Sequence, residues 1–197
     1  MFKLRKNFFT RETTKVATDL LNCVLVRVTE TSAVLKGRIV ETEAYLGLKD
    51  DSCHSFGGRK TKRTQVMYLP GGYAYIYFTY GMHYCFNIVT AGRREPEAVL
   101  IRALEPIEGI SEMQENRLKK DIKNLTRGPG RLCQALNISK NLNGADMEGS
   151  RLYVEKGNFM SLERIAVSER IGLSPFRLSR YWPLRFYIKD NPFVSIY

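Results

Sequence analysis

Two aromatic-rich runs, residues 73–78 and 83–89, constrain the fold of this chain more than any other feature. They flank the segment Thr79-Tyr80-Gly81-Met82, in which Gly81 is free to adopt a positive φ angle. Two apolar runs joined by a short glycine-containing segment predict an antiparallel β-hairpin. Other strand-like runs follow one another with no regular alternation of strand and helix. We therefore predict an α+β fold with a curved, mostly antiparallel sheet.

The remaining elements are predicted from shorter patterns of apolar and turn-forming residues. We expect strands at residues 23–28, 33–45, 98–104, 151–154, 163–168 and 184–189, with Gly37 as a bulge or a point of close approach. Thr10 is expected to cap a helix with the apolar stripe Val16, Ala17, Leu20 and Leu21, and further helices are expected at 109–123 and 131–136. No linker divides the chain, so we expect a single domain over residues 1–197.

A long polar segment, residues 46–66, interrupts this pattern of strands. It contains glycine and five basic residues: Lys49, Arg59, Lys60, Lys62 and Arg63. Loops of this length within a compact domain are often functional. We therefore expect this loop to contribute to a binding site.

The charge of the chain limits the classes of partner. It has 31 Lys and Arg against 20 Asp and Glu, a net charge of +11. Nucleic acid is the first candidate partner, an acidic membrane surface the second, and a basic protein with no anionic partner the third explanation. We recognise no signal peptide and no run long enough to span a bilayer. The four cysteines are dispersed without a C-x-x-C pair, which argues against a zinc ribbon and favours a reducing compartment.

The strand at 33–45 carries the first candidate chemical group. Side chains alternate along a strand, so Glu41, Glu43 and Tyr45 share one face. A carboxylate beside an aromatic ring can act as a general base at the wall of a site. Taken alone, the strand favours a simpler explanation, in which both glutamates pair with nearby basic residues.

The aromatic hairpin offers a second candidate. Tyr73, Tyr75 and Tyr77 fall on one face and could stack on an unpaired base. Tyr80 lies at or beside the tip, where an exposed ring could insert into a base stack. Ordinary core packing is the alternative for several of these aromatics, and only the position of Tyr80 favours function.

Metal and nucleotide-cofactor chemistry receive little support. The only histidines, His54 and His83, have no carboxylate at metal-ligand spacing. His54 lies in the long loop and could fold back toward Tyr45 as a hydrogen-bonding group, whereas His83 is expected to be structural. The chain also lacks a Walker loop, G-x-G-x-x-G and G-x-S-x-G.

Several motifs in order along the chain strongly resemble the alkyladenine (3-methyladenine, or methylpurine) DNA glycosylase family. They are Arg-Ile-Val-Glu-Thr-Glu-Ala-Tyr-Leu-Gly at 38–47, His-Ser-Phe-Gly-Gly-Arg at 54–59, Thr-Tyr-Gly-Met at 79–82, Leu-Ile-Arg-Ala-Leu-Glu-Pro at 100–106, Gly-Pro-Gly-Arg-Leu-Cys-Gln-Ala-Leu at 128–136 and Pro-Leu-Arg-Phe-Tyr at 183–187. Residues 90–98 and 139–162 match no motif of the family. The resemblance implies a single α+β domain with a curved antiparallel sheet and a protruding β-hairpin.

The resemblance also implies roles for particular residues. Glu43 would activate water and Arg102 would help to hold it, with Glu41 as a rival base. The base pocket would be formed by Tyr45, His54, Tyr77 and Asn87. The remaining implied contacts are Tyr80 as the intercalating residue, Met82 behind it and Arg59 on the DNA backbone.

The implied reaction is the hydrolysis of the N-glycosidic bond of a flipped, damaged purine, which leaves an abasic site. The resemblance implies no metal and no organic cofactor, double-stranded DNA containing damaged purines as the partner, no membrane and a monomer. We expect a compact bacterial member in the cytoplasm with the nucleoid, or a nuclear protein if the source is eukaryotic. Substrates beyond 3-methyladenine could include hypoxanthine, ethenoadenine and 7-methylguanine. A catalytically silent DNA-binding module and an RNA-binding protein are the alternatives.

Overall fold

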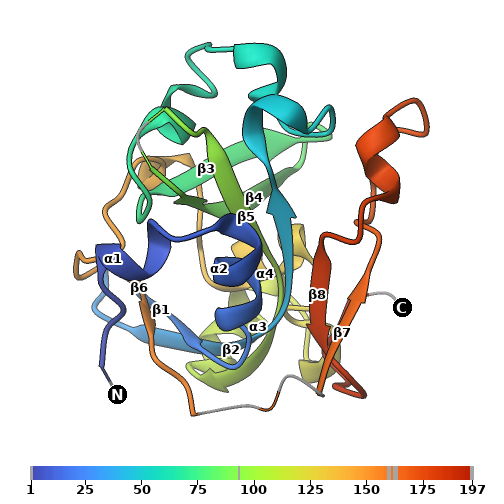
Figure 1. Cartoon of the computed structure of the whole chain (residues 1–197). Coiled ribbons are helices and arrows are strands. Elements are labelled where there is room, and N and C mark those ends of the chain that lie inside the picture. The colour runs from blue at the N-terminus through green and yellow to red at the C-terminus, as the bar shows by residue number, and fades with distance from the viewer. Residues whose placement is uncertain (1, 93, 159–160, 162–163, 196–197) are drawn as a thin grey trace.

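The fold is built on one curved antiparallel sheet, as predicted. The computed structural model describes residues 2–92, 94–158, 161 and 164–195. The strand order is β3-β4-β5-β2-β1-β6, with β8 paired to β2 and β7 paired to β8, and every strand pairing is antiparallel. Short helices pack against this sheet, which gives the α+β class (Figure 1).

The elements have the following bounds. The strands are β1 (Val24–Val28), β2 (Val34–Tyr45), β3 (Ala74–Thr79), β4 (His83–Thr90), β5 (Glu97–Glu108), β6 (Leu152–Glu155), β7 (Ile165–Ser168) and β8 (Arg185–Ile188). The α-helices are α1 (Lys6–Phe9), α2 (Thr13–Asp19), α3 (Ile110–Arg117) and α4 (Pro129–Ala135). Short 3-10 helices occur at Gly47–Lys49, Phe56–Gly58, Gln65–Tyr68, Ile122–Asn124, Lys140–Leu142 and Leu178–Tyr181.

The long strands β2 and β5 form the centre of the sheet. Their register shifts between Lys36 and Gly37, where a Cβ atom on Gly37 would lie 2.9 Å from the Cβ of Leu104. The predicted bulge and the predicted close approach at Gly37 are therefore both confirmed. Further shifts flank Glu41, and β2 pairs with β1 before this point and with β8 after it. Such irregularities bend a strand, and the last residue of β2, Tyr45, lines a cavity.

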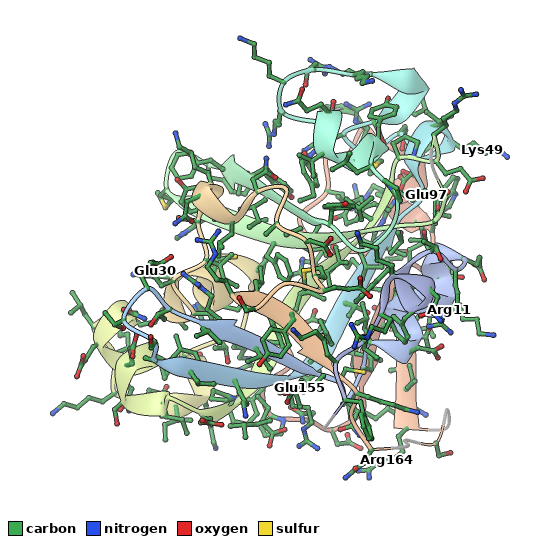
Figure 2. All side chains as sticks on the ribbon, turned by 90° about the vertical axis from the view of Figure 1, so that its left-hand side faces the viewer. Arg11, Glu30, Lys49, Glu97, Glu155 and Arg164 are labelled. Carbon is green, nitrogen blue, oxygen red and sulfur yellow. The ribbon has the colours of Figure 1, made fainter. Side chains whose placement is uncertain are left out.

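The apolar side chains form two clusters. The larger one includes Val16, Ala17 and Leu20 on the segment of α2, packed on the sheet. The smaller one joins the long loop to the hairpin through buried residues such as Cys53 and Tyr75. Charged side chains such as Glu30, Lys49 and Arg164 are exposed on the outside (Figure 2).

Several predicted helix boundaries are wrong. Thr10 ends α1 and caps no following helix, because α2 begins at Thr13 after Glu12. The helix predicted over 109–123 ends at Arg117, since Leu118 adopts a left-handed conformation with φ 51°. The helix predicted from Arg131 begins at Pro129, which is well suited to a first helical turn.

The strand predictions hold to within a few residues at most ends. The start of the predicted strand 163–168 lies outside the described residues, and β5 extends four residues beyond the predicted end at Leu104, to Glu108. All four cysteines are free and buried. Within the described ranges, no helix is both long enough and apolar enough to cross a membrane.

Candidate active site

A cavity of about 340 Å³ opens between the hairpin, the long loop and the chain that follows β7. Six of the nine predicted site residues line it: Tyr45, His54, Tyr77, Tyr80, Asn87 and Arg102. They come from β2, the long loop, β3, the hairpin tip, β4 and β5. The fold therefore gathers residues from distant parts of the chain around one cavity.

Glu43 lies against the wall of this cavity. Its side chain is fully buried, and Oε1 accepts a hydrogen bond of 2.7 Å from the backbone N–H of Ile171. Oε2 accepts a bond of 2.9 Å from the hydroxyl of Tyr45, and Oε1 lies 3.3 Å from Nη1 of Arg102. These three partners line the cavity, whereas Glu43 itself is not among the lining residues. Its carboxylate is therefore held just behind the surface that a ligand would touch.

Glu41 has a different environment on the same strand face. Its Oε1 accepts hydrogen bonds from Nε of Arg102 at 3.0 Å and from Nε of Arg185 at 2.7 Å. The hydroxyl of Ser195 also donates to Oε1, at 2.9 Å, and the backbone N–H of Ser195 donates to Oε2, at 2.7 Å. The simpler explanation from the sequence thus holds for Glu41, whose carboxylate is occupied by structural partners. Among the residues that the structure describes, Arg102 is the partner that Glu41 shares with Glu43.

His54 folds back from the long loop to the aromatic wall. Its Nδ1 is hydrogen-bonded to the hydroxyl of Tyr75 at 2.8 Å, and its ring lies edge-on to Tyr77 with centroids 4.6 Å apart. Burial, together with the positive charges of Arg63 and Arg59, lowers the pKa of His54 to about 4. The imidazole is therefore neutral at pH 7, and its other ring nitrogen, Nε2, is left to donate or to accept a hydrogen bond according to the tautomer.

Tyr45 and Tyr77, the two tyrosines predicted for the base pocket, each contact a guanidinium group. Arg170 lies 4.6 Å from the ring centroid of Tyr45, and Arg63 lies 4.8 Å from that of Tyr77. Neither arginine lines the cavity, so both approach the rings from outside it. Burial raises the pKa of both tyrosines well above the usual value. The hydroxyl of Tyr45 therefore stays protonated and donates to Glu43.

Asn87 forms part of the floor. It is 3% exposed, and its Nδ2 donates a hydrogen bond of 3.0 Å to the backbone oxygen of Tyr75. This bond fixes the orientation of the amide. A fixed amide can discriminate between bases by the groups they present to it.

The hairpin tip is exposed. Thr79 pairs with His83, and the three intervening residues include Tyr80, 79% exposed, and Met82, 68% exposed. Both Tyr80 and Gly81 have positive φ angles, 52° and 68°. The predicted hairpin and the predicted conformation of Gly81 are confirmed, and the turn displays two large apolar side chains.

Arg59 lies outside the main cavity. It is exposed and lines an adjoining hollow together with His54 and Arg177. The remaining predicted residue, Met82, also lies outside the main cavity, on a separate depression beside His83.

A buried ion pair behind the cavity was not predicted. Arg170 and Asp50 have side chains with no exposed surface and are bonded through both guanidinium Nη atoms, one at 2.9 Å. Arg170 also donates to the backbone oxygens of Ala44 and Ser179, at 3.0 Å each. The pair therefore fastens the chain around Ile171 to the end of β2. Its members lie 120 residues apart, and no local pattern connects them.

Tyr75 was placed on the face of the hairpin that could stack on a base, but it was not assigned to the base pocket. It lines the cavity and holds His54, and its place on the Tyr77 side of the hairpin could have indicated this role. Among the described residues, no group of three or more His, Cys, Asp or Glu side chains could hold a metal ion.

Comparison with known proteins identifies the family. The family model for methylpurine-DNA glycosylase matches residues 7–192. A protein of Desulfitobacterium hafniense (strain Y51), named "Putative 3-methyladenine DNA glycosylase", is 46% identical over 204 aligned positions that cover 100% of both chains. Proteins with the same name from Clostridium novyi (strain NT) and Carboxydothermus hydrogenoformans are 45% and 48% identical and cover 98–99% of each chain.

The class of protein follows from the match over nearly the whole chain. The protein is a DNA glycosylase, an enzyme that hydrolyses N-glycosyl bonds in DNA repair. It belongs to the methylpurine-DNA glycosylase family.

Proposed function

We propose that the protein excises alkylated purines, 3-methyladenine foremost, from duplex DNA by flipping the nucleotide and hydrolysing its glycosidic bond with an activated water. The relatives named for 3-methyladenine support this substrate. The observation that carries the mechanism is the buried carboxylate of Glu43, held by three donors at the wall of an aromatic cavity.

The first step is extrusion of the damaged nucleotide. Taking a base out of the stack costs a few kcal/mol, and a damaged pair costs less than an intact one. Tyr80 is exposed at the tip and also lines the cavity mouth. Its ring can fill the vacancy left in the duplex and recover part of the stacking.

The second step is recognition of the base. Tyr45 and Tyr77 present ring faces to a flipped purine, and a cationic N-alkylated adenine gains about 0.5–2 kcal/mol from such faces. Neutral His54 can form a hydrogen bond to the base edge through Nε2. Asn87 would exclude purines whose exocyclic group clashes with its amide, which the bond to Tyr75 holds in place.

The third step is hydrolysis. Water attacks C1′ of the sugar, the bond from C1′ to the purine nitrogen breaks, and its electron pair leaves with the base. Glu43 takes a proton from the water and stabilises the positive charge that develops on the sugar. A cationic 3-methyladenine leaves as a neutral base, so this substrate needs no general acid. Arg102, shared with Glu41, keeps Glu43 in place and helps to hold the water.

Free-base analysis tests this function. Duplex DNA treated with a methylating agent is incubated with the protein, and free 3-methyladenine and abasic sites are quantified. We expect one abasic site for every free base released, because water is the nucleophile and the strand is left intact. We further propose that the enzyme acts as a monomer, since one chain supplies every residue of the site. Tight binding without base release would instead favour a silent recognition module.

A further inference from the structure

The loop that follows β7 displays an unusual set of apolar side chains. We call residues 172–181 the mouth loop. Within it, Phe176 is 91% exposed, Leu178 81% and Tyr181 60%. Single exposed apolar residues are common, but several together on one short loop mark an interaction surface.

The mouth loop lies beside the cavity. Gly172 and Leu173 line it together with Tyr80 of the hairpin tip. The next residues, Ser174 and Arg177, line the adjoining hollow with Arg59. Figure 1 shows the loop, in red, rising beyond the end of β8 on the same side as the cyan long loop. A molecule that reaches the cavity past Tyr80 therefore meets the mouth loop as well.

The backbone of the mouth loop is anchored. The carboxylate of Asp51 accepts hydrogen bonds from the backbone N–H groups of Leu178, at 2.8 Å, and Ser179, at 3.0 Å. Arg170 holds the backbone oxygen of Ser179 at 3.0 Å. The exposed rings are thus presented by a fixed backbone, which lowers the entropic cost of binding through them.

The charges around these rings indicate the kind of partner. Arg177 is exposed next to Phe176, Arg180 lies 5.1 Å from the ring of Tyr181, and Arg59 faces the same hollow. Apolar rings interleaved with arginines, on a chain of net charge +11, fit a nucleic-acid backbone with accessible base or sugar faces. An apolar peptide or a second copy of this basic chain would not complement these charges.

We propose that the mouth loop is a second DNA-contacting element, in which Phe176 packs against the duplex beside the flipped nucleotide and Arg177 contacts a phosphate. Tyr80 and Phe176 then engage the DNA from different elements at the mouth of the cavity. The proposal rests on damaged duplex DNA being the substrate.

Binding of duplex DNA that contains a stable abasic-site analogue tests the proposal, with an undamaged duplex in parallel. Phe176→Ala is compared with Phe2→Ala, which removes a phenylalanine of similar exposure, 86%, near the N-terminus. Figure 1 shows this terminus at the lower left, away from the mouth loop. We expect Phe176→Ala to weaken binding of the analogue by about tenfold and Phe2→Ala to leave it unchanged.

A salt titration of DNA binding separates the contribution of the Arg177 charge from that of the Phe176 ring. Arg177→Ala should lower the dependence of log K on log salt by about one phosphate contact, whereas Phe176→Ala should leave the slope unchanged. Wild-type affinity of Phe176→Ala, or an equal loss in Phe2→Ala, would overturn the proposal and would leave a protein or membrane partner for this loop. The wild-type protein is assayed for base release in the same series. Failure of base release in that sample would count against the proposed function and not against the mouth loop.

Discussion

Replacing Arg170 with methionine would leave the Asp50 carboxylate buried without its cation. Both side chains have no exposed surface, and Asp50 also accepts hydrogen bonds from Ser179 and from the backbone of Leu46 and Ser52. These neutral donors do not replace a positive charge. Removing one member of a buried ion pair costs about 3–5 kcal/mol, a large part of the stability of a domain of this size. We expect Arg170→Met to lose stability in that range at pH 7.

The loss should depend on pH. Burial alone would raise the pKa of Asp50, but hydrogen bonds from Arg170 and Ser179 outweigh it, and the pKa lies below the usual 3.8. In the wild type the stability contributed by Asp50 is therefore present above about pH 4 and lost as the pH falls through the lowered value. Without Arg170, burial raises the pKa of Asp50. Protonation of this carboxyl then removes the buried, unpaired charge that destabilises the variant. The difference between the two proteins should shrink as the pH falls below about 5.

Urea denaturation at pH 7 and at about pH 4 measures both effects. Asp50→Asn in the Arg170→Met background should recover at least about 2 kcal/mol at pH 7, because the unpaired charge is gone. Arg27→Met is a matched control, since Arg27 is equally buried but its partner Glu30 is 53% exposed and keeps its hydration. In Figure 2 Glu30 lies far from Lys49 of the long loop. Equal losses for Arg170→Met and Arg27→Met, or no recovery in the double variant, would refute the reasoning.

Three further predictions concern the cavity. The NMR signals of His54 should not titrate near pH 6.5 but only toward pH 4, where its pKa lies; a midpoint near 6.5 would show that the ring is not buried as described. Tyr80→Ala, which removes a 79% exposed ring, should leave urea stability within about 0.5 kcal/mol of wild type. The same variant should weaken binding to a lesion duplex, and unchanged binding would exclude intercalation by this residue. Arg63→Gln removes a positive charge 4.8 Å from the Tyr77 ring centroid and should raise the release of cationic 3-methyladenine relative to neutral hypoxanthine by roughly fivefold, about 1 kcal/mol. An unchanged ratio in single-turnover assays would show that the charge of Arg63 does not act on the bound base.

The sequence predicts those parts of the site that depend on local periodicity. The alternation along β2 puts Glu41 and Glu43 on one face, and both carboxylates meet Arg102. The glycine in the hairpin turn predicts an exposed tip at Tyr80. Family resemblance then adds residues that no local pattern connects, and six of the nine line one cavity.

Other features depend on contacts between distant segments. Glu41 and Glu43 have equivalent positions in the strand pattern. Arg185 and Ser195, far along the chain, bond to Glu41 and so distinguish this structural carboxylate from that of Glu43. The Asp50–Arg170 pair joins two loops and has no periodic signature. The overlong helix prediction failed at Leu118, whose left-handed conformation follows from no glycine or proline.

Single-turnover base release by Glu43→Gln tests the central claim most directly, with binding to the same lesion duplex measured in parallel. Arg102 keeps Glu41 as a partner in this variant, so the fold should be preserved. Loss of a general base should slow release of 3-methyladenine by at least about a hundredfold, while affinity for the duplex stays near that of the wild type. Release at the wild-type rate would contradict the assignment of the water-activating carboxylate to this position.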